Sequence, residues 1–233
     1  MVLRSSVPHG METRGSRGVV TGLWLSPKSV QEVSRTVFGR MAWWLSPVIW
    51  PDEEDAHRRM VVQALRNGAR HFVLNAPWQL GLFPERDDLD FIAGPFCNIG
   101  NAAALACLRE HGFSAAIVSP ELAGEDLLAL PKESCLPLGV VLSGFWPMGI
   151  ARHQLEGVKP GEPFSSPKGE VFWARRYGQN TWIYPGWPLD ISARRAELDA
   201  AGYAFGVRID EYPPKNLPEA RRASTFNWDL PLL

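Results

Sequence analysis

The sequence predicts an α/β protein in which half of a TIM-like barrel, built from parallel βα units, is followed by an irregular β-rich part. Short apolar runs alternate with stretches of helical periodicity, as in parallel βα units. The runs are continuously apolar, which is typical of strands buried on both faces of a sheet. This pattern occupies residues 19–150, whereas a closed eight-stranded barrel takes about 250 residues. We therefore expect roughly half a barrel.

The chain opens with a segment that carries no such pattern. Residues 1–18 are polar and rich in Gly, Ser and Arg, so we expect a disordered leader there. The first strand is expected within the apolar run Gly18–Leu25. A helix is expected over Ser29–Val37, with Ser29 as its N-cap and Glu32 three residues later, which is a capping-box pattern.

The following βα units repeat the order of strand and then helix. Apolar residues recur at helical spacing between residues 52 and 66, and Asn67-Gly68 is a typical helix end. Proline closes several of the apolar runs, which is where a buried strand must stop. On these grounds we expect strands within 41–50, 71–76, 89–93, 115–119 and 138–144, and helices at 52–66, 98–110 and 121–130.

Residues 151–233 differ in character, because they are rich in Pro, Gly and Trp. The short runs EVFWARRY and NTWIYP and the run FGVRID (205–210) indicate strands, and SARRAELDAAGY (192–203) indicates a helix. We expect irregular β structure that packs on the barrel-like domain at 19–150. The many tryptophans are expected to form a small core there, with a carbohydrate-stacking surface as the alternative.

Composition narrows the functional classes. The net charge of −1 argues against a nucleic-acid-binding protein, and no apolar run is long enough to span a membrane. Three cysteines without a CxxC pair speak against a disulfide framework and a zinc finger, so a cytoplasmic location is expected. The common nucleotide-binding loops and the HExxH motif are also missing, and we expect no cofactor and no metal.

The candidate site follows from the expected topology, because parallel α/β sheets bind ligands at the carboxyl ends of their strands. Glu121 is the candidate catalytic acid or base, although a carboxylate in a first helical turn also offsets the helix dipole. For Asn75 and Ser119 the alternative is a capping role. Cys97 is expected to be a structural thiol. The expected substrate-binding residues are Asn75, Asn98, Asn101, Ser119, Arg152 and His153.

Part of the chain carries a pattern of turns typical of one known family. The segment GPFCNIGNAAALACLREHGFSAAIVSPELAGEDL holds an N-x-x-N turn (Asn98 and Asn101) and an S-P-E-L turn (Ser119 and Glu121). The segment LPLGVVLSGFWPMGIARH then ends a strand in a Gly-rich turn before the basic Arg152. Through these motifs the chain from residue 90 to residue 153 resembles the collagenase-like peptidase family (peptidase U family 32).

The resemblance implies a barrel fold and a hydrolase, with Glu121 as the acid or base and Arg152 as an anion clamp. Some members resemble oxygen-independent hydroxylation factors that hold an iron–sulfur cluster on four cysteines. This chain has three cysteines, and His153 stands near the place of the first cluster cysteine, so we expect no cluster. The alternative is a catalytically degenerate binding module or partner subunit.

The expected partners follow from both lines of argument. A half-barrel leaves two sheet edges unpaired, so we expect a truncated gene product, a homo-oligomer, or a partner subunit that completes the barrel. The ligand is expected to be a peptide or a small polar molecule, and neither nucleic acid nor a membrane span is expected.

Overall fold

A computed structural model describes residues 1–6, 18–153, 156–220 and 224–229. Within these residues, eight parallel strands close into a barrel, and each strand pairs with a neighbour on both sides. Closure occurs where β13 pairs with both β7 and β1. The barrel strands are β1 (Val2–Arg4), β2 (Thr21–Trp24), β3 (Ala42–Trp44), β4 (His71–Leu74), β5 (Asp90–Ala93), β6 (Ala115–Ile117), β7 (Leu138–Gly144) and β13 (Phe205–Asp210).

The expected half-barrel is therefore wrong, although the parallel barrel architecture is confirmed. Val2–Arg4 was expected in a disordered leader, yet it forms β1 and buries Leu3 between β2 and β13. Most of that expected leader, residues 7–17, lies outside the described residues. Because closure leaves no barrel edge unpaired, the expectation that a second subunit completes the barrel is also wrong.

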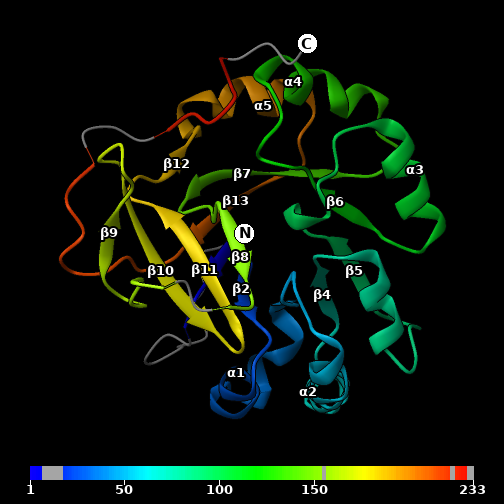
Figure 1. Cartoon of the computed structure of the whole chain (residues 1–233). Helices are drawn as coiled ribbons and strands as arrows, with labels where there is room; N and C mark the ends of the chain where they lie inside the picture. Colours follow the sequence, from blue (N-terminus) through cyan, green and yellow to red (C-terminus); the bar gives the residue numbers. More distant parts are fainter. Residues whose placement is uncertain (7–17, 154–155, 221–223, 230–233) are drawn as a thin grey trace.

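Helices cover the outside of the barrel (Figure 1). In that view α1 and α2 lie below the barrel, α3 lies to its right, and α4 and α5 lie above it. Short 3-10 turns replace or extend the helices at several strand ends. The helices are α1 (Pro27–Glu32), α2 (Glu54–Arg66), α3 (Ala102–Glu110), α4 (Gly124–Glu133) and α5 (Arg195–Ala201), and the 3-10 turns are η1 (Arg35–Arg40), η2 (Pro51–Glu53), η3 (Pro77–Leu82), η4 (Pro95–Cys97) and η5 (Ser192–Arg194).

The first helix begins three residues earlier than expected. Ser26 is its N-cap, because its Oγ accepts a hydrogen bond from Ser29 N–H at 3.1 Å. Ser29 Oγ in turn accepts one from Ser26 N–H at 2.9 Å. Ser29 therefore completes the capping box from inside the helix, and the expectation that it caps the helix is wrong. Pro27 at the first helical position fits this start, since its missing N–H would have no helical partner.

A four-stranded antiparallel sheet is inserted between β7 and β13, and Figure 1 shows it in yellow and green beside the barrel, opposite α3. Its order is β8-β11-β10-β9. Trp173, Trp182 and Tyr184 form its buried core, as expected of the tryptophans. A further strand, β12 (Leu189–Asp190), pairs antiparallel with β7. The sheet consists of β8 (Gly149–Ala151), β9 (Pro163–Ser165), β10 (Val171–Tyr177) and β11 (Asn180–Pro185).

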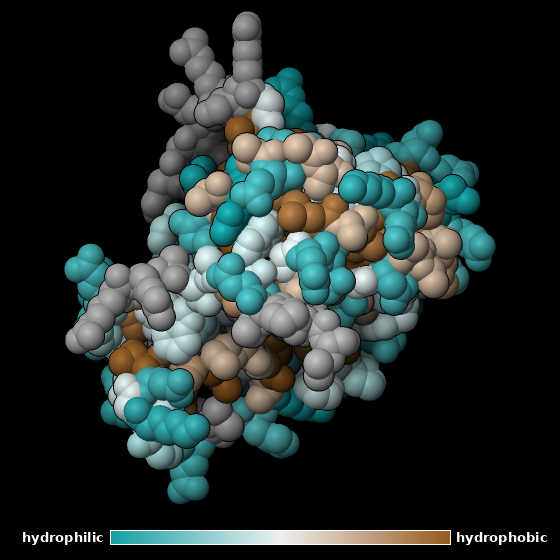
Figure 2. Space-filling view, turned by 90° about the horizontal axis from the view of Figure 1, so that it is seen from above, coloured by the Kyte–Doolittle hydropathy of each residue, from teal (hydrophilic) through white to brown (hydrophobic). Residues whose placement is uncertain are grey.

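The surface has a mixed character. Seen from above, hydrophobic residues lie between hydrophilic ones (Figure 2). Over the part of the chain that the structure describes, no helix is both long and apolar enough to cross a membrane.

Candidate functional site

The antiparallel sheet packs against the carboxyl ends of the barrel strands. Trp182 of β11 contacts Trp24 at the end of β2, with ring centroids 5.4 Å apart, and Phe96 after β5, at 5.6 Å. Trp24 also meets Trp44 at the end of β3, at 5.7 Å. The sheet therefore covers part of the barrel mouth, where ligands bind in barrels of this class.

A cavity of about 260 Å³ lies between this sheet, the ends of β2 and β3, and the start of α2. Three aromatic side chains, Trp24, Tyr177 and Trp182, form part of its wall. Aliphatic side chains form much of the remainder, as in most small-molecule sites. The polar side chains at the wall are Ser26, Ser46, Glu53, His57 and Asn180.

Most of these polar groups are already engaged. Ser46 Oγ donates to Val48 O at 2.9 Å, and the Asn180 amide accepts from Trp50 Nε1 at 2.8 Å and donates to Val48 O at 3.1 Å. Glu53 Oε2 accepts from Trp50 N–H at 3.2 Å. Among the described residues, Glu53 Oε1 and His57 Nε2 have no hydrogen-bond partner, so these atoms can serve a ligand.

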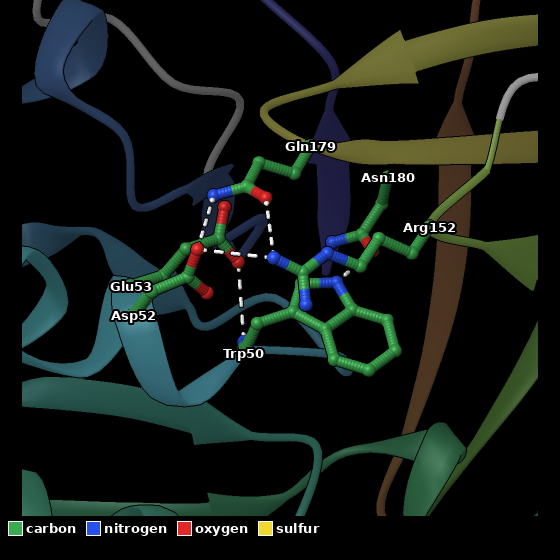
Figure 3. A network of polar contacts seen from close by, with 6 residues as sticks. All are labelled: Trp50, Asp52, Glu53, Arg152, Gln179 and Asn180. Carbon is green, nitrogen blue, oxygen red and sulfur yellow. Dashed lines mark hydrogen bonds and ion pairs between the residues drawn. The ribbon is translucent and has the colours of Figure 1, made fainter.

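A network of polar contacts fixes one wall of the cavity (Figure 3). Arg152, at the end of β8, donates to Asp52 at 3.0 Å and to Gln179 at 3.2 Å, and its guanidinium lies 5.0 Å from the centre of the Trp50 ring. Gln179 donates to the same Asp52 oxygen at 3.3 Å. The network thereby joins the turn between β10 and β11 to η2.

A buried charge cluster lies beside the cavity. Tyr177 donates from its hydroxyl to Glu211 at 2.7 Å, and Arg175 forms an ion pair with the same carboxylate. The Glu211 side chain is only 3% exposed, and this burial raises its pKa above the usual range, although Arg175 acts in the opposite direction. Burial, and then the charge of Glu211, raises the pKa of Tyr177.

Glu211 is not among the residues predicted from the sequence, although it directly follows β13 and, like Asn75, is a polar residue at the end of a barrel strand. The reason is that FGVRID was assigned to the irregular C-terminal part, whereas it is a barrel strand. Glu53 and His57 were also missed, because helix residues with charged neighbours resemble an ordinary solvated face.

The sequence-predicted residues Asn75 and Ser119 are buried at strand ends. Asn75 donates from its backbone N–H to Gln79 Oε1 at 2.9 Å and from Nδ2 to Leu45 O at 2.7 Å. Its Oδ1 is buried and has no partner among the described residues. Ser119 Oγ accepts from Glu121 N–H at 3.3 Å. Both side chains thus hold turns, which is the alternative that the sequence left open.

The remaining predicted residues are exposed. Asn101 caps α3 by accepting from Ala104 N–H at 2.9 Å, and Asn98 ends η4 in the left-handed region at φ 51°. The backbone oxygen of Glu121 accepts from Asn227 at 2.6 Å. Arg152 belongs to the network described above, and His153 follows it. None of the seven predicted residues lines the cavity, and the structure does not gather them into one pocket.

Cys97 is a poor nucleophile in this environment. Its Sγ donates to Leu74 O at 3.4 Å, and burial raises the pKa of the thiol to about 12. Cys107 and Cys135 are exposed.

In the folded protein at pH 8 we expect an excess of a disulfide reagent such as DTNB to modify Cys107 and Cys135 rapidly and Cys97 only after unfolding. Rapid reaction of Cys97, measured with the Cys107→Ser/Cys135→Ser variant, would contradict the assignment.

In the described part of the chain, no group of three or more His, Cys, Asp and Glu side chains is placed to hold a metal ion.

Comparison with protein-family models, with curated proteins and with solved structures finds no match for this chain. Fold and site together define a closed parallel barrel with a cavity of about 260 Å³ at its partly covered mouth. Kinship with the collagenase-like peptidases stays a prediction.

Proposed function

We propose that this protein binds a small molecule in the cavity between the barrel and the inserted sheet. The observation that supports the proposal is the cavity itself, which lies at the carboxyl ends of β2 and β3 and has aromatic and aliphatic walls with few polar groups, among them Glu53 Oε1 and His57 Nε2. Concave, mostly apolar sites with few polar groups are typical of small-molecule binding.

This proposal corresponds to the binding module that the sequence left as the alternative to a hydrolase. Hydrolase activity stays a prediction. Its candidate acid or base, Glu121, is exposed and lies outside the cavity. A general acid or base needs to be within hydrogen-bond reach of its substrate. The cavity therefore favours binding over turnover at Glu121.

Filling the cavity tests the proposal. Ala56 lines the cavity and is exposed on α2, so Ala56→Trp should obstruct the cavity with little effect on folding. We expect fragments found by saturation-transfer NMR to bind the natural chain and to lose their signals with Ala56→Trp. The matched control is Ala103→Trp, which is exposed on α3 away from the cavity. Equal signals from all three proteins, or no bound fragment at all, would refute the proposal.

A further inference from the structure

We propose that the ligand of this cavity is a small organic cation of the methylated-ammonium class, held by aromatic rings and one carboxylate. The inference rests on the proposed function, since it names the chemistry of that same site.

The aromatic residues of the wall are arranged at steep angles to one another. Trp24 and Trp182 meet at 74° with centroids 5.4 Å apart, and Tyr177 and Trp182 meet at 72° with centroids 5.3 Å apart. Trp182 is only 3% exposed, so the half-buried Trp24 and Tyr177 offer most of the aromatic surface that is open to the cavity. Aromatic cages recognise quaternary and methylated ammonium groups through the negative faces of such rings.

A carboxylate completes the arrangement. Glu53 lines the same cavity, and its Oε1 lies close to Gly178 in the turn after Tyr177, since a Cβ on that glycine would be 3.5 Å away. Among the described residues that line the cavity, Glu53 is the one acidic or basic side chain apart from His57. The carboxylate of Glu53 therefore favours a cation over an anion in this cavity.

The surroundings do not favour an anion. The amino end of α2 would attract negative charge, but Asp52, Glu53, Glu54 and Asp55 already stand in η2 and the first turn of α2. Arg152, the nearest cation in the network, is already paired with Asp52. Neutral apolar ligands fit the walls but leave the free oxygen of Glu53 without a partner.

Two probes of nearly the same size and shape, one charged and one neutral, show how much the positive charge contributes to binding. Choline carries a trimethylammonium group, and 3,3-dimethyl-1-butanol replaces its nitrogen by carbon. By isothermal titration calorimetry we expect choline to bind at least about tenfold more tightly than the alcohol, because desolvated cation–π contacts and one carboxylate act on the charge alone. Glu53→Gln should weaken choline binding by about tenfold and leave the alcohol unchanged.

The control variant is Glu54→Gln, which removes the neighbouring carboxylate without touching the cavity wall, and should leave both affinities unchanged. Equal affinity for choline and the alcohol would overturn the cation assignment. So would fragments that bind to a protein that does not bind choline. Neither result would contradict the proposed function. Choline binding that survives Ala56→Trp would place the cation elsewhere and overturn the inference. If the natural chain binds neither choline, nor the alcohol, nor any fragment, the proposed function itself is refuted.

Discussion

Replacing Glu211 by alanine is expected to lower the free energy of unfolding by about 3 kcal/mol, as measured by urea denaturation at pH 7. The change leaves the Arg175 guanidinium and the Tyr177 hydroxyl without the carboxylate that both contact. Arg175 is 31% exposed and can regain water, which is why we expect the lower end of the range for a broken buried pair. A loss below about 0.5 kcal/mol, the size of an ordinary surface change, would contradict this account.

The matched control is Glu211→Gln, which keeps an acceptor for Tyr177 and does not titrate. Burial raises the pKa of Glu211 in the folded state above its ordinary value of 4.5. Between these two pKa values the folded state retains a proton that the unfolded state has lost, so this group's contribution to stability falls as pH rises. The stability of the natural chain relative to Glu211→Gln should therefore decrease above pH 4.5 and become constant above the folded-state pKa.

Replacing Gly144 by alanine is expected to cost about 3–5 kcal/mol, the sum of backbone strain and overpacking. Gly144 ends β7 at φ 129°, a conformation that L side chains rarely adopt, and a Cβ there would lie 2.2 Å from the backbone oxygen of Ile209. It pairs with β13 on one side and with β12 on the other, so neither neighbour can move freely.

The control for this change is Gly149→Ala, at the start of β8, where a Cβ would meet no atom within 4 Å. We expect that variant to remain within about 1 kcal/mol of the natural chain in the same urea titration. Similar losses for both variants would show that the close approach of β7 and β13 does not control stability at Gly144.

The parallel strands were predictable because burial on both faces leaves a continuous apolar run, as in HFVL at β4 and LGVVLSG at β7. Closure of the barrel was not predictable, since β1 and β13, the two strands that close it, lack a continuous apolar run. β1 is only VLR, with arginine as its third residue, and β13 is separated from β7 by the whole inserted sheet. Pairing between segments so far apart depends on contacts that no local pattern encodes.

The same limit applies to the candidate site. The strand-end rule indicated polar residues at the barrel mouth, and Asn75 and Ser119 do lie at strand ends. The cavity, however, forms where β10 and β11 return to the start of α2, and Trp50 meets Asn180 across 130 residues of sequence. A local reading of Glu53 and His57 shows only the polar face of a helix.

The ion pair between Arg152 and Asp52 and the hydrogen bonds of Asn180 differ in how easily they open. Both side chains are substantially exposed, at 40% and 54%, and exposed ion pairs are typically worth about 0–1 kcal/mol. Asn180, by contrast, is buried and anchors the same turn through two hydrogen bonds. The outer ion pair can therefore open locally while the two hydrogen bonds of Asn180 keep the turn between β10 and β11 attached to the barrel.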